Sequence, residues 1–148
     1  MKHRITVAAI AAATALAGTG ALVVPASAST SAPKSHTLTF TSVQEAVHNY
    51  TATTSSQQDK DVNRAGKVVG YDLLYIVFNP KKETAKLNFT AVTGSGFVYG
   101  VASASASPVI HGTVTGGTGA FKGATGTILA RNLNPSGSKT AVTITYHV

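Results

Sequence analysis

GTVTGGTGAFKGATG, residues 112–126, sets repeated glycines around short β-like pieces and one buried-type aromatic residue, Phe121. Glycine has no Cβ and tolerates positive φ, so clustered glycines mark tight bends or close approaches between backbones. We expect Phe121 to anchor such a bend against a core. The segment therefore predicts a corner of a β-barrel.

The same glycines do not make a phosphate cradle. After Gly117 and Gly119 the next glycine is Gly123, so the G-x-G-x-x-G pattern fails by one residue. Lys122 precedes Gly123 instead of following a P-loop glycine, which also excludes the G-x-x-x-x-G-K-[ST] motif.

The beginning of the chain is typical of an export signal. Lys2 and Arg4 precede an uncharged run over residues 5–24, and Ala26-Ser27-Ala28 fits an A-x-A cleavage site. We expect residues 1–28 to be a signal peptide, residues 29–36 a flexible tail and residues 37–148 a single β-barrel domain. The mature protein would then be secreted, without stable membrane insertion. The alternative is an uncleaved membrane anchor, which the alanine-rich, glycine-containing run and the lack of a following basic cluster disfavour.

Composition restricts the function further. Removal of residues 1–28 leaves 120 of 148 residues, which suffices for one core, and the chain has no cysteine to cross-link an exported domain. A closed sheet or an oligomer would supply that stability. The formal net charge is +7, but acidic residues are interspersed among the lysines, which is typical of a solvated rim and not of a nucleic-acid stripe. We expect no nucleic-acid partner.

Short β-type segments follow one another at a spacing of roughly ten residues, which predicts an all-β antiparallel sandwich or barrel. Closure removes sheet edges, so a single eight-stranded antiparallel barrel of lipocalin-like shape is favoured, and such a barrel can hold one small ligand. Residues 55–67 are polar and charged and are predicted to form a loop, and residues 43–54 are ambiguous between a strand and a helical turn. The predicted strands cover residues 37–41, 68–78, 85–92, 96–104, 109–115, 126–132 and 141–148.

The order of these signatures resembles the allene oxide cyclase barrel-like and dirigent-like superfamily. The matching pieces are GKVVG at residues 66–70, the GGTGAFKGATG core at residues 116–126 and TAVTITY at residues 140–146. The resemblance covers roughly residues 59–148. It implies an eight-stranded barrel with an apolar cavity, often trimeric in plant members, and therefore a homo-oligomer here.

The resemblance also implies a class of chemistry. Plant allene oxide cyclases, which are isomerases, rearrange an unsaturated fatty-acid epoxide into a cyclopentenone, and dirigent proteins steer the coupling of phenoxy radicals. Both handle a reactive apolar molecule in a shaped pocket. The basic position of the family's glycine-rich motif is occupied here by Lys122.

Candidate ligand-binding residues are Asp72, Tyr71, Tyr75, Tyr99, Lys122 and Tyr146. A carboxylate in an apolar strand either faces a cavity, where burial raises its pKa, or caps a strand end beside a turn. The phenols can line a pocket or can belong to the core with satisfied hydroxyls. No residue is assigned a catalytic role.

Other kinds of site are not indicated. His48, His111 and His147 match no short metal-binding motif, so neither a metal nor a cofactor is expected. A hydrolase serine needs an elbow such as G-x-S-x-G, which the chain does not contain.

Two hypotheses follow. In the first, a secreted barrel binds a small apolar or phenolic molecule and steers its cyclisation or coupling. In the second, the barrel is a non-catalytic extracellular carrier or interaction module.

Overall fold

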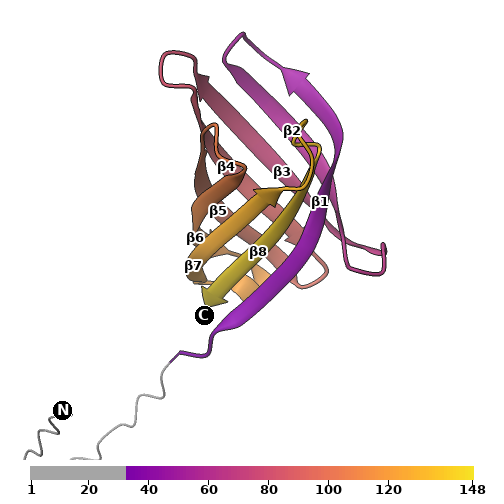
Figure 1. Cartoon of the computed structure of the whole chain (residues 1–148). Helices are drawn as coiled ribbons and strands as arrows, with labels where there is room; N and C mark the ends of the chain where they lie inside the picture. Colours follow the sequence, from indigo (N-terminus) through magenta and orange to yellow (C-terminus); the bar gives the residue numbers. More distant parts are fainter. Residues whose placement is uncertain (1–32) are drawn as a thin grey trace, which may run out of the picture. The chain divides into compact units, whose positions relative to one another are not determined.

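The computed structural model describes residues 33–148, which form a closed barrel of eight antiparallel strands (Figure 1). Each strand pairs with the next along the chain, and the last pairs with the first, from His36 opposite Tyr146 to Val43 opposite Lys139. The predicted all-β barrel is therefore confirmed. The strands are β1 (His36–Asn49), β2 (Thr54–Val62), β3 (Val68–Asn79), β4 (Thr84–Thr93), β5 (Gly96–Ala104), β6 (Val109–Gly117), β7 (Thr125–Asn132) and β8 (Lys139–His147).

Side chains alternate between the interior and the outer surface because successive residues of a strand point to opposite faces. On β8 the interior positions are Val142, Ile144 and Tyr146, each at most 9% exposed, whereas Thr143 and Thr145 are only half-buried. The interior-facing side of β8 is thus its apolar side. The buried hydrophobic core comprises Phe89, Ala91, Val98, Val114, Phe121, Ala124, Ile128, Ala130, Val142, Ile144 and Tyr146.

One end of the barrel is closed by the glycine-rich segment. A single 3₁₀ turn, η1 (Gly119–Phe121), turns Phe121 inward, where it is 3% exposed and its ring meets that of Tyr146 edge-on at 5.3 Å. A Cβ at Gly117 would collide with the carbonyl oxygen of Phe97 and with Phe121 itself, so glycine is needed there. Phe121 therefore anchors the bend against the core, as the sequence predicts.

The opposite end is open. Figure 1 shows the β1–β2 and β3–β4 turns extending beyond the β7–β8 turn at that end. Strands β1 and β3 have 14 and 12 residues, whereas β7 has 8, so the wall is taller on one side. A molecule entering the interior would do so past the β7–β8 turn.

Two parts of the chain differ from the sequence-based expectation. Residues 43–49 continue β1 as a strand, with a register shift between Gln44 and Ala46, and the predicted loop at residues 55–67 is mostly strand β2. The loop prediction was wrong because the inward positions of β2 are Gln57, Asp59 and Asp61, so the strand has no apolar face. The other predicted strands are confirmed to within a few residues.

The expected signal peptide and residues 29–32 of the expected tail lie outside the described residues. The barrel begins with His36. Residues 33–148 contain no helix long and apolar enough to cross a membrane.

Candidate functional site

The open half of the barrel contains a cavity of about 260 Å³. Its wall is mostly apolar, with the rings of Phe40 and Phe89 and the side chains of Leu74, Ile76 and Ile128. Its mouth is lined by Asn132 and Thr140 together with Ser136 and Gly137 of the β7–β8 turn. Asp59 and Asp72 also line it and are directly paired between β2 and β3. The cavity is therefore an apolar chamber with carboxylates on one wall.

Asp59 is held in place by neighbours from two strands. The Ser42 hydroxyl donates a hydrogen bond of 2.7 Å to Asp59 Oδ2. The amide of Gln57 donates from Nε2 to Oδ1 at 2.9 Å and to Oδ2 at 2.8 Å. These donors compensate a carboxylate that is only 3% exposed.

Asp72 and Asp61 form a second, less compensated pair. Asp72 is 4% exposed and Asp61 2%, and the Oδ1 atom of each is buried without a hydrogen-bond partner. Burial first, then the charge of Asp72 and a hydrogen bond to its side chain, raise the pKa of Asp61 from the ordinary value of 3.8 to about 8. Burial and then the charge of Asp59 raise the pKa of Asp72 to about 6. Two carboxyl groups this close cannot both ionise readily, so the pair retains a proton at a pH where surface aspartates are charged.

Gly70 makes room for this pair. Its position is opposite Asp61 in the β2–β3 register, and a Cβ there would lie 3.3 Å from Asp61 Oδ2 and collide with the carbonyl oxygen of Val92. Gly70, the second glycine of the GKVVG segment, therefore leaves space for the buried carboxyl group of Asp61 beside Asp72.

No lysine or arginine in the described part of the chain lies against the buried carboxylates. Every lysine and arginine within residues 33–148 is exposed except Lys60, which is half-buried and lies 3.3 Å from Glu45 across β1 and β2. None of them lines the cavity. The cavity therefore carries uncompensated acidic groups inside a basic protein.

The six candidate ligand-binding residues do not all lie at one site. Asp72 lies in the middle of β3, not at a strand end, and lines the cavity. Tyr71 and Tyr75 are on the outer face, each 45% exposed, because the inward positions of β3 are the even-numbered residues. Tyr99 alternates with the inward-facing Val98 and Gly100 and is therefore also on the outer face, beside Phe97.

The remaining two candidates lie towards the closed end. Lys122 is exposed directly after η1, and Tyr146 is buried against Phe121 without reaching the cavity wall. Of the six candidates, only Asp72 lines the cavity.

Sequence reasoning missed Asp59, Asp61, Ser42 and Gln57. One signal was present: Gln57, Asp59 and Asp61 alternate at period two, as the inward residues of a strand would. A turn at Gly66, where φ is +77°, joins this alternation to the strand that contains Asp72. Predicting a hairpin that turns at Gly66 would have placed Asp59 and Asp61 close to Asp72.

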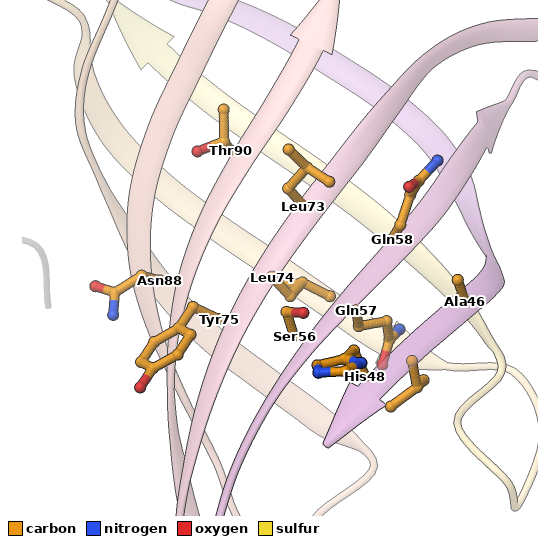
Figure 2. Close-up of a pocket in the computed structure, with 11 residues that line it drawn as sticks. Ala46, His48, Ser56, Gln57, Gln58, Leu73, Leu74, Tyr75, Asn88 and Thr90 are labelled. Atoms are coloured by element: carbon orange, nitrogen blue, oxygen red, sulfur yellow. The ribbon is translucent and has the colours of Figure 1, made fainter. Parts of the chain in front are cut away.

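A second, larger hollow of about 600 Å³ is an open groove on the outer face of β1 to β4. Figure 2 shows His48, Ser56, Tyr75 and Asn88 along it, which are consecutive partners across the four strands. Gln57 and Leu74 line both the groove and the cavity. None of the described residues along the groove is a carboxylate, so the buried acidic residues belong to the smaller interior cavity.

The three histidines considered as metal ligands lie on different strands: His48 on β1, His111 on β6 and His147 on β8. Within the described part of the chain, no group of three His, Cys, Asp or Glu side chains is placed to hold a metal ion. This includes the three aspartates.

No protein-family model matches the sequence, and no curated protein matches it. Solved structures do. A pyocyanin demethylase superposes with a TM-score of 0.64 at 17% identity, covering 75% of this chain and 99% of that chain. A pterocarpan synthase dirigent protein has a TM-score of 0.64 at 16% identity, covering 78% of this chain and 89% of its own.

The chain has the dirigent-like barrel fold. An exo-specific intermolecular Diels-Alderase shares it, with a TM-score of 0.62 at 10% identity over 78% of this chain and 99% of that chain. The fold expected from the resemblance is therefore confirmed. The names of these structural neighbours refer to different reactions, so the function must be argued from the cavity itself.

Proposed function

We propose that this barrel binds a small apolar or aromatic molecule in its interior cavity and steers its cyclisation or coupling by proton transfer at Asp72. The observation that carries the proposal is a buried carboxyl group with an unpartnered oxygen on the wall of an apolar chamber. Such a chamber with a few polar groups is typical of a small-molecule site.

Asp72 is the member of the acidic cluster suited to act on the ligand, because it lines the cavity, as Asp61 does not, and has an oxygen without a hydrogen-bond partner, as Asp59 does not. Asp61 lies behind it and supplies or receives the shared proton, as the raised pKa values of both groups favour. Asp59 lies beside the pair and is fixed in place by hydrogen bonds from Ser42 and Gln57. In this arrangement Asp72 can deliver a proton to a reacting oxygen or remove one from an activated carbon.

Ligand capture tests the proposal. The purified protein is incubated with a lipid and phenolic extract, and bound and converted molecules are identified by mass spectrometry. We expect an apolar or aromatic molecule to be retained and converted by the wild type. Asp72→Asn should convert each bound molecule at least tenfold more slowly, because the amide keeps the shape and cannot transfer the proton.

Glu45→Gln is the matched control, because it also replaces a carboxylate by an amide but does so on the outer surface. Conversion that is equal in wild type and Asp72→Asn would remove Asp72 from the mechanism. Retention without conversion by the wild type would favour the non-catalytic carrier.

We further propose that the protein is exported and cleaved after Ala28. The A-x-A site and the preceding uncharged run support this. The intact mass of material from the culture medium should correspond to a chain beginning at Ser29, and a full-length membrane-bound chain would contradict it.

A further inference from the structure

The distribution of acidic residues in this chain is uneven. The chain has five acidic residues, and three of them, Asp59, Asp61 and Asp72, are buried together inside the barrel. The chain as a whole has a formal net charge of +7. The only strongly acidic environment in the described barrel is therefore its interior.

Within the barrel this negative charge is only partly compensated. The hydrogen bonds of Ser42 and Gln57 are directed at Asp59, whereas an oxygen of Asp72, which lines the cavity, has no partner. No lysine, arginine or histidine is part of the cavity wall. Burying a carboxylate without a positive partner is costly, and a bound cation would remove that cost.

We infer that the cavity takes an organic cation, an amine or quaternary ammonium on an aromatic or short alkyl body, with its nitrogen against Asp72 and Asp59. This inference rests on the proposed binding function and names the chemical class of the ligand. The apolar body would pack on Leu74, Ile76 and Ile128, which line the same chamber.

The composition of the wall favours an organic cation over a metal ion. The described aspartates are not arranged to hold a metal, as noted above. Phe40 and Phe89 are aromatic residues of the wall, and aromatic rings attract ammonium groups when water is excluded. The volume of about 260 Å³ lies below the usual range for drug-sized ligands, which limits the body to a small ring system.

A cation in this position would displace the proton that Asp61 and Asp72 share, because the positive charge stabilises both carboxylates. The titratable groups involved are Asp59 and Asp61 from β2 and Asp72 from β3. The other strands contribute none to the cavity wall, which there consists of apolar side chains, Ser42, Gln44, Asn132 and Thr140. Binding should therefore release a proton and should strengthen as the pH rises.

Calorimetry with two probes of matched shape tests the inference. Phenyltrimethylammonium carries a fixed charge, and tert-butylbenzene is its neutral isostere. We expect the ammonium to bind at least tenfold more tightly at pH 8 than at pH 5.5. At pH 7 its binding should release protons, seen as a dependence of the observed heat on the ionisation enthalpy of the buffer, and the neutral probe should release none.

Three variants make the test specific. Asp72→Asn should lose at least tenfold in ammonium affinity at pH 8, whereas Glu45→Gln should match the wild type. Asp61→Asn should still bind the ammonium but with little proton release, because the stored proton is gone. Asp61→Asn provides the test even if Asp72→Asn does not fold.

The two proposals fail differently. Binding of tert-butylbenzene with no binding of the ammonium would overturn the cationic ligand and leave the apolar binding site standing. Binding of neither probe would overturn both. Equal ammonium affinity in wild type and Asp72→Asn would also overturn the inference.

Discussion

At the scale of single residues, Asp61 and Asp72 determine how the barrel responds to pH. Both have a folded-state pKa above the ordinary value of 3.8, because burial and neighbouring carboxylates disfavour their charged forms. Between about pH 4 and pH 8 the folded chain therefore binds more protons at these groups than the unfolded chain does. Stability from this source is highest at acidic pH and is lost as the pH rises through that window.

We predict that Asp61→Asn makes the barrel more stable at pH 8 and flattens its pH dependence. The gain in the free energy of unfolding should exceed about 1.4 kcal/mol, the equivalent of one pKa unit, because the amide removes a buried ionisation. Urea denaturation at pH 5 and pH 8 measures it, with Glu45→Gln as the surface control. A variant less stable than the wild type at pH 8 would show that the folded protein stabilises the Asp61 carboxylate in its charged form.

The sequence singled out one of the residues that line the cavity, and the reason is physical. Asp72 stands out because it interrupts an apolar run. The tyrosines could not be placed, because both faces of β3 are apolar: Leu74 and Ile76 point inward, whereas Leu73 and Val77 point outward. Alternation tells which residues share a face but not which face is inside.

At the scale of elements, β2 is the strand that sequence reasoning failed to predict, and it lines the candidate site. A strand is recognised by apolar residues at period two, and β2 carries Gln57, Asp59 and Asp61 at those positions instead. Local patterns conflict with the global fold mainly at functional sites. Strand β2, which was predicted to be a loop because it is polar, supplies two of the three buried acids, Asp59 and Asp61.

In the glycine-rich corner, by contrast, the local sequence pattern and the role of the segment in the folded barrel agree. We predict that Phe121→Ala lowers the free energy of unfolding by about 3–5 kcal/mol, because it empties a well-packed site at the closed end. Phe97→Ala, at a side chain that is 41% exposed, should cost less than about 1 kcal/mol.

Denaturation of both variants at one protein concentration provides the comparison. Equal losses in the two would mean that η1 does not close the barrel in solution.

At the scale of the whole molecule, the outer face of β3 carries a stripe of exposed hydrophobic side chains. Tyr71, Leu73, Tyr75 and Val77 are each between 39% and 49% exposed. A stripe of this kind is typical of an interaction surface. We propose that it mediates self-association, in keeping with the oligomer implied by the family resemblance.

We predict that Leu73→Asp shifts the protein from an oligomer to a monomer, because it places a charge in the middle of the stripe. Leu129→Asp is the matched control: Leu129 is 47% exposed on β7, four strands away around the barrel. Light scattering coupled to size-exclusion chromatography measures the masses. A wild type that is monomeric at high concentration would exclude this assembly.

In the proposed mechanism, Asp61 and Asp72 share a proton inside the barrel at neutral pH. Carboxyl ¹³C chemical shifts followed against pH test it directly, because the chain has only five acidic side chains, and exposed Glu45 and Glu83 serve as internal references. We predict that two aspartate resonances, assigned to Asp61 and Asp72 by their Asn variants, titrate well above the ordinary range near pH 4. Five resonances that all titrate near pH 4 would contradict the account.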